Sequence, residues 1–183
     1  MRDEVYSDMK ISMMDVDSTT GEEKEIVTNV PVADNVVNNE QSNDNKTYEV
    51  DYSKYLGVLE IPKIGLKRGF YNVGSRYNNI QYNVTMVEGS DLPDVVNGNL
   101  ILMAHSGDAY ISYFAYLYKL NVGDQAFVTY GGNTYKYQIV NIYNVPKTGA
   151  VTIHRNLDRT TLTLITCTKN SDTEQTVYIA EMI

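Results

Sequence analysis

Short apolar and β-branched runs, each bounded by polar or turn residues, recur along the chain after residue 55 and are typical of β-strands. The run LGVLEIPKIGL (56–66) contains Pro62, which predicts a break or bulge because proline cannot donate a hydrogen bond to a sheet. A short strand is expected at GFYNV (69–73), and NGNLILMAH (97–105) reads as a fully apolar strand. This half of the region therefore predicts short strands separated by turns.

The next segment, YFAYLYKL (113–120), places three apolar residues three apart, as one face of a short helix would: Phe114, Leu117 and Leu120. The glycine of the following NVGD predicts the end of this helix. A β-hairpin is then expected over QAFVTYGGNTYKYQIVNIYNV (125–145), since its two β-rich arms meet at residues suited to positive φ, Gly131-Gly132-Asn133.

Two further strands, TLTLITC (161–167) and TVYIAEMI (176–183), follow near the C-terminus. The pattern thus contains about seven or eight strands and at most one or two short helices. This combination predicts an all-β fold, a closed or nearly closed β-barrel, over residues 55–183.

Charge separates this region from the beginning of the chain. Residues 1–50 contain 4 basic and 12 acidic side chains, whereas residues 51–183 contain 11 of each. We expect residues 1–54 to form an acidic, largely disordered stalk or linker, since such a polar segment cannot bury a core. The neutral region after it lacks basic clusters, so no nucleic-acid partner is expected.

The composition also limits membrane and metal chemistry. No stretch approaches the roughly 18 to 20 apolar residues that span a bilayer, so membrane association is expected only through an anchor outside this sequence. The single cysteine excludes an intramolecular disulfide, and one Cys with two His cannot build a four-ligand cysteine zinc site. No metal or cofactor is expected.

The one thiol, Cys167, lies where an apolar strand meets a polar loop. A buried cysteine is commonly inert, and a nucleophilic one needs a base or cationic partner near neutral pH. Of the two histidines, His105 ends the strand LILMA at a similar strand-to-loop position, whereas His154 lies among charged residues in a predicted surface loop. Each has an ordinary structural interpretation when taken alone, and together Cys167 and His105 indicate a nucleophilic site.

Acyl transfer also requires a hydrogen-bond donor directed at the developing oxyanion. Candidates lie within the cysteine strand and on both sides of it, and the spacing does not choose among them: Gln175, Thr166, Arg155 and Arg159.

Four stretches resemble the sortase family, the cysteine transpeptidases of Gram-positive cell surfaces, and they occur in the family's order: GVLEIPKIGL (57–66), LILMAHSG (100–107), FAYLYKLNVGD (114–124) and TLTLITC (161–167). The resemblance covers roughly residues 55 to 183. It implies an eight-stranded sortase-type β-barrel at the extracellular face of the cell membrane, anchored by a segment that precedes this sequence.

The resemblance also implies a reaction. His105 and Cys167 match the family's catalytic pair. Cys167 would attack the threonine carbonyl of an LPxTG-like sorting signal of a surface protein, and His105 would protonate the leaving glycine amine. An amine of peptidoglycan or of a pilin would then release the acyl-enzyme. No cofactor takes part.

One position departs from the family. The family's catalytic arginine opens the last strand, and here that position is Gln175, in QTVYIAE. A glutamine amide donates a hydrogen bond but has neither positive charge nor a bidentate fork. Three explanations are open: a native substitution aided by another donor such as Arg155 or Arg159, a natural or engineered change that traps substrate, or a shifted alignment.

Two further alternatives follow from this comparison with the family. The loss of the arginine allows a catalytically impaired module that binds a sorting signal or partner without turnover. For the subclass, the chain lacks the Asp-Pro-aromatic lid signature of pilin-polymerising sortases, and the region before Cys167 is too short for the long insertion of the haem-associated class. A class A-like or class D-like protein is expected.

Overall fold

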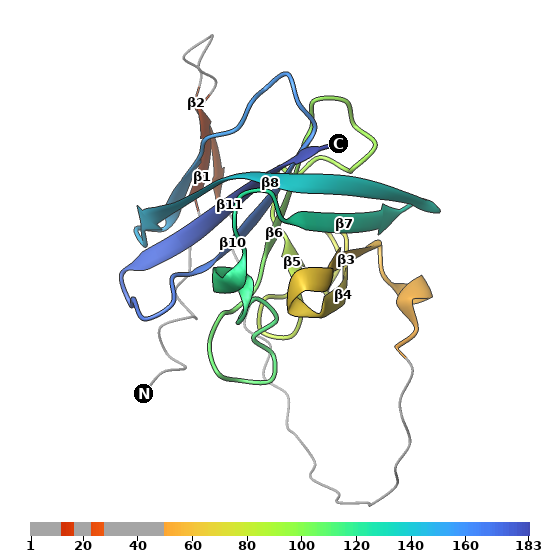
Figure 1. The fold of residues 1–183 in the computed structure, drawn as a ribbon, viewed down its shortest axis with the longest axis horizontal. Coiled ribbons are helices and arrows are strands. Elements are labelled where there is room, and N and C mark those ends of the chain that lie inside the picture. The colour runs from red at the N-terminus through yellow and green to blue at the C-terminus, as the bar shows by residue number, and fades with distance from the viewer. Residues whose placement is uncertain (1–11, 17–22, 28–49) are drawn as a thin grey trace, which may run out of the picture.

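The computed structural model describes residues 12–16, 23–27 and 50–183, and Figure 1 shows their arrangement. The eleven strands have the following bounds: β1 Ser12–Val16, β2 Glu23–Val27, β3 Gly57–Ile61, β4 Leu66–Phe70, β5 Thr85–Met86, β6 Asn99–Met103, β7 Gln125–Tyr130, β8 Asn133–Pro146, β9 Ala150–Ile153, β10 Thr161–Cys167 and β11 Glu174–Met182. Three 3₁₀ turns accompany them: η2 Tyr52–Lys54, η3 Pro62–Ile64 and η4 Leu117–Lys119.

Eight of these strands form one sheet in the order β4-β3-β7-β8-β11-β10-β6-β5. Neighbours are antiparallel except β6 and β10, which run parallel. The sheet coils until its ends approach, and a bridge between Phe70 and Val84 joins the two edges. The predicted all-β, eight-stranded, nearly closed barrel is confirmed, and its helices are only single 3₁₀ turns.

Proline and glycine define the first two barrel strands. Pro62 ends β3 and begins η3, and Gly65 adopts φ 65°, which lets β4 return antiparallel to β3. The break predicted at Pro62 is confirmed. The strand predicted over 69–73 is confirmed only as far as Phe70, where β4 ends.

The central hairpin follows its turn residues, because Gly131 and Gly132 connect β7 to β8 with φ of 57° and 82°. The helix predicted over 113–120 is wrong in extent, since only η4 forms there. One reason is that the Phe114 N–H donates to the carbonyl of His105, at 2.9 Å, and not to a preceding helical turn. The predicted buried face is nevertheless present, with Phe114, Leu117 and Leu120 all inside the barrel.

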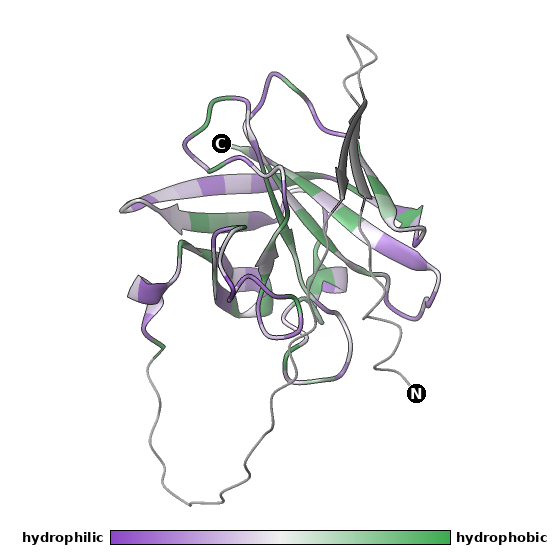
Figure 2. Ribbon diagram, turned by 180° about the vertical axis from the view of Figure 1, so that it is seen from behind, coloured by the Kyte–Doolittle hydropathy of each residue, from purple (hydrophilic) through white to green (hydrophobic). Residues whose placement is uncertain are grey.

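The strands β6, β8, β10 and β11 contribute to two apolar layers, because alternate side chains point to opposite faces. In β10, Leu162 and Leu164 belong to the barrel interior, whereas Ile165 belongs to an outer layer. That outer layer is covered by β9, whose Val151 and Ile153 are almost fully buried. Figure 2 shows hydrophobic residues concentrated along these strands.

A second, three-stranded sheet continues from β9 in the order β2-β1-β9. The strand β1 runs parallel to β9 and antiparallel to β2, so two strands of the predicted acidic linker pair with the connection between β8 and β10. Most of that linker, residues 1–54, lies outside the described residues, and its character as a stalk stays a prediction. Within the described ranges, no helix has the length and hydropathy needed to cross a bilayer.

Candidate active site

Three candidate side chains meet at one end of three neighbouring strands. The parallel pairing of β6 with β10 aligns Met103 with Ile165, and two residues further along these strands are His105 and Cys167. The antiparallel pairing of β10 with β11 places Gln175 directly opposite Cys167. The order of strands along this edge therefore sets histidine, cysteine and glutamine side by side.

These three residues also share one face of the sheet. Met103 and Ile165 point into the outer apolar layer, and so does Val177 of β11. Because side chains alternate with a period of two residues, His105, Cys167 and Gln175 lie on that same outer face.

Hydrogen bonds tie the histidine segment to the cysteine strand. The Ser106 hydroxyl donates to the Cys167 carbonyl at 2.7 Å, and the Thr166 hydroxyl donates to the Ala104 carbonyl at 2.8 Å. Thr166 follows the interior residue Leu164 by two positions, so its side chain points away from the face of the thiol. Of the predicted candidates, Thr166 thus has a hydroxyl that joins the two strands.

Cys167 and His105 are both buried, with exposed fractions of 8% and 7%. Burial lowers the pKa of His105, and the positive charge of Lys147 lowers this pKa further. A lowered pKa favours the neutral imidazole, which can accept the proton of a thiol. A small hollow adjoins Cys167 on the interior side of the strands, because its lining includes the barrel residues Phe114 and Tyr178.

Gln175 is 1% exposed, and its Nε2 has no hydrogen-bond partner among the residues that the structure describes. A buried donor without a partner costs about 1–3 kcal/mol. An amide donor held in this way beside Cys167 can bind a carbonyl oxygen, or the oxyanion that forms when a thiolate attacks that carbonyl.

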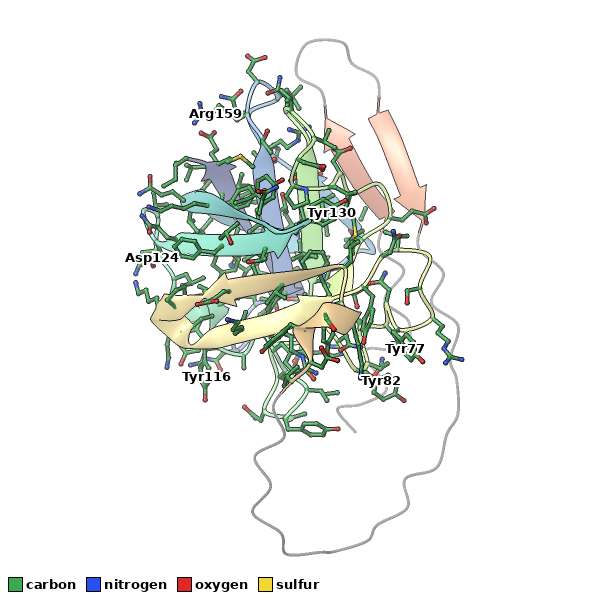
Figure 3. The ribbon with its side chains drawn as sticks, turned by 90° about the vertical axis from the view of Figure 1, so that its right-hand side faces the viewer. Tyr77, Tyr82, Tyr116, Asp124, Tyr130 and Arg159 are labelled. Atoms are coloured by element: carbon green, nitrogen blue, oxygen red, sulfur yellow. The ribbon has the colours of Figure 1, made fainter. Side chains whose placement is uncertain are left out.

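The two arginine candidates lie elsewhere. The guanidinium of Arg159 contacts Glu181 at 3.4 Å and donates to the carbonyl of Met182 at 3.2 Å, and Arg155 donates to the carbonyl of Asn97 at 3.0 Å. These contacts gather at the beginning of β10, roughly 20 Å from Cys167 at 3.3 Å per strand residue. Figure 3 shows Arg159 at the opposite end of the molecule from Tyr116, whose chain neighbour Ala115 lines the hollow. The structure does not bring either arginine to the thiol.

His154 is also outside the site. It is exposed, its backbone N–H donates to the Tyr143 hydroxyl at 2.8 Å, and its ring lies 5.2 Å from the Tyr143 ring. No group of three or more His, Cys, Asp or Glu side chains in the described ranges could hold a metal ion.

The sequence analysis missed one charged residue, Lys147. It follows β8, the strand that pairs with β11, and its charge reaches His105. Its only signal in the sequence is its position two residues after the predicted hairpin 125–145, next to Pro146.

Comparisons with known proteins identify the family to which this barrel is similar. The family model described as the sortase domain matches residues 59–183. Sortase C1 from Streptococcus agalactiae is similar at 29% identity and a TM-score of 0.61, covering 76% of this chain and 72% of that protein. The lid mutant of sortase A from Corynebacterium diphtheriae shares the fold at 24% identity and a TM-score of 0.61, covering 70% of this chain and 69% of that one. A comparison with curated proteins gave no match.

The sortase domain match includes every strand from β6 to β11 and all three candidate residues, and it spans more than half of the chain. The same barrel topology appears in solved sortases of two kinds. The chain therefore belongs to the sortase family of cysteine transpeptidases.

Proposed function

We propose that the protein cleaves an LPxTG-like sorting signal at its threonine through a Cys167 thioester and transfers the acyl group to an amine of peptidoglycan or of a pilin. The observation that carries this proposal is the register that sets His105, Cys167 and Gln175 on one face at one end of three adjacent strands. Family membership supplies the reaction class.

In the first half-reaction the Cys167 thiolate attacks the threonine carbonyl, forming a carbon–sulfur bond and an oxyanion. The Gln175 Nε2 donates a hydrogen bond to this oxyanion. The intermediate then collapses, the carbon–nitrogen bond breaks, and the His105 imidazolium gives its proton to the leaving glycine amine. In the second half-reaction the acceptor amine attacks the thioester, His105 takes its proton, and the thiolate leaves.

The proposed location is the extracellular face of the cell membrane, where both a sorting signal and a cell-wall amine occur. A class A-like or class D-like assignment is part of the proposal, and the absence of an Asp-Pro-aromatic lid signature supports it. Solved sortases A and C resemble the barrel equally well, with TM-scores of 0.61, so overall shape does not separate these classes.

The test is intact-protein mass spectrometry after incubation with a panel of LPxTG-type peptides. We expect a mass increase equal to the acyl fragment on the wild-type protein, removed by hydroxylamine and absent from Cys167→Ala. Adding a glycine peptide should convert the adduct into a transpeptidation product.

One alternative has an observation in its favour, since the neutral Gln175 occupies the family's arginine position. A module that binds a sorting signal without turnover would show saturable peptide binding to the wild-type protein and no adduct. That result would replace the transpeptidase proposal.

A further inference from the structure

The side chain of Lys147 lies on the face of the sheet that carries the candidate catalytic residues. The Lys147 N–H donates to the Thr173 carbonyl at 2.7 Å, which extends the ladder between β8 and β11 by one pair beyond Pro146 and Glu174. Val145, the partner of Gln175, packs against the outer layer. Lys147 is two residues beyond Val145, so it takes the same face.

The charge of Lys147 acts across the strip of sheet that holds the site. Three spacings of about 4.8 Å separate β8 from β6, because β11 and β10 lie between them. The ammonium nevertheless lowers the pKa of His105, the residue that follows β6 by two positions. The two strands between them carry Gln175 and Cys167, so both residues lie between the lysine and the histidine on this face of the sheet.

Three other cations that flank β10 have contacts of their own. The guanidinium groups of Arg155 and Arg159 hold carbonyl oxygens at the far end of β10. The ammonium of Lys169, in the loop after Cys167, lies 3.5 Å from the centroid of the Tyr118 ring. Lys147 shares the face of the sheet that carries the thiol, and its register places it beyond Val145, the partner of Gln175.

The site needs such a charge. A neutral amide at position 175 can donate a hydrogen bond to an oxyanion but cannot neutralise it, and preorganised charge is worth far more in a buried site than in water. We propose that Lys147 supplies the positive charge and Gln175 the hydrogen bond, so that two residues share the role that one arginine has in other members of the family. This inference rests on the proposed function.

The pKa of His105 depends on the charged and titratable groups around it. Lys147 approaches from the end of β8, Cys167 from β10 and the neutral Gln175 from β11, while Asp108 follows in the histidine's own loop. Replacing Lys147 with a neutral residue removes a positive charge that disfavours protonation of the His105 imidazole. The proposal therefore couples two effects of one substitution, slower acylation and a higher pKa of His105.

The first experiment measures single-turnover acylation by an LPxTG-type peptide in four proteins: wild type, Lys147→Met, Lys147→Arg and Lys147→Met/Gln175→Arg. We expect Lys147→Met to slow acylation about tenfold to a hundredfold. This loss does not exceed the loss of rate that removal of one oxyanion donor typically causes. Lys147→Arg should stay within about threefold of wild type, and Gln175→Arg should rescue Lys147→Met. Unchanged acylation in Lys147→Met, or no rescue by either arginine, would overturn the assignment.

The second experiment needs no substrate. NMR titration of both histidines in wild type and Lys147→Met should show a higher pKa for His105 in the variant and no change for His154. If the pKa of His105 is the same in Lys147→Met as in the wild type, the placement of Lys147 is overturned. If the wild type forms no acyl-enzyme with any peptide, the proposed function fails, and this titration still decides whether Lys147 faces the histidine.

Discussion

The two ends of β10 are built from similar residues and differ in what their polar groups do. At the beginning of the strand, the hydroxyls of Thr161 and Thr163 both donate to the Asn99 Oδ1, at 3.0 and 2.9 Å. Beside them Arg159 contacts Glu181. These polar groups contact one another within the fold, as buried groups in a structural region do.

At the other end, Cys167 closes the strand between His105 and Gln175, and the Gln175 Nε2 has no partner in the described chain. Asn99 also keeps an unpaired Nδ2, but its oxygen already binds two hydroxyls. The difference indicates that the hydrogen bonds at the beginning of β10 stabilise the fold, whereas the Gln175 amide at its other end can bind a ligand. Four substitutions test this difference between the two ends of β10.

The largest effect is expected from His105→Ala, because it removes the proposed proton donor for the leaving amine. Acyl-enzyme formation should fall by about 10² to 10⁴. The matched control is His154→Ala, which should stay within about twofold of wild type since that histidine is outside the site. Equal losses in the two variants, measured by mass spectrometry of the adduct, would contradict the assignment of His105.

Gln175→Ala should come next. Removal of one oxyanion donor typically costs about 2.7–4 kcal/mol, roughly a hundredfold to a thousandfold in rate. The free energy of unfolding should also fall, because the truncation leaves a cavity at a side chain that is 1% exposed, although the amide nitrogen makes no hydrogen bond in the described protein. Acylation kinetics and urea denaturation together test this, and a stability loss without a rate loss would make Gln175 structural.

Thr163→Val tests the opposite end of the strand. The substitution keeps the shape of a fully buried side chain and removes one hydroxyl bonded to Asn99. We expect the free energy of unfolding to fall by about 1 kcal/mol, the usual contribution of such a hydrogen bond, with unchanged acylation. Urea denaturation measures the first quantity, and a loss of rate in the folded variant would show that the two ends are not separate.

The smallest effect is expected from Arg159→Ala. Its ion pair with Glu181 is partly exposed, with side-chain exposures of 48% and 22%, and pairs at the surface contribute about 0–1 kcal/mol. Acylation should be unchanged, since the guanidinium lies at the far end of β10. A tenfold slower reaction, at unchanged melting temperature, would restore Arg159 as a candidate oxyanion donor.

Much of the barrel could be predicted from local pattern. The break at Pro62 and the turn at Gly131-Gly132 follow from what proline and glycine allow in the backbone. The short strand β9 was missed because its packing on the outer layer involves residues distant in sequence, among them Ile101. The helix over 113–120 failed for a similar reason, a backbone hydrogen bond from Phe114 to His105.

The type of barrel and the candidate pair could be predicted from the sequence alone. Cys167 and His105 each lie where an apolar strand meets a loop, within motifs that resemble the sortase family. Which other residues lie beside this pair depends on the tertiary structure. Cross-strand register, which no local pattern encodes, sets Gln175 opposite the thiol and carries both arginines to the other end of β10. The same register directs Lys147 onto the face of the site, because strands neighbouring in the sheet are far apart in the chain.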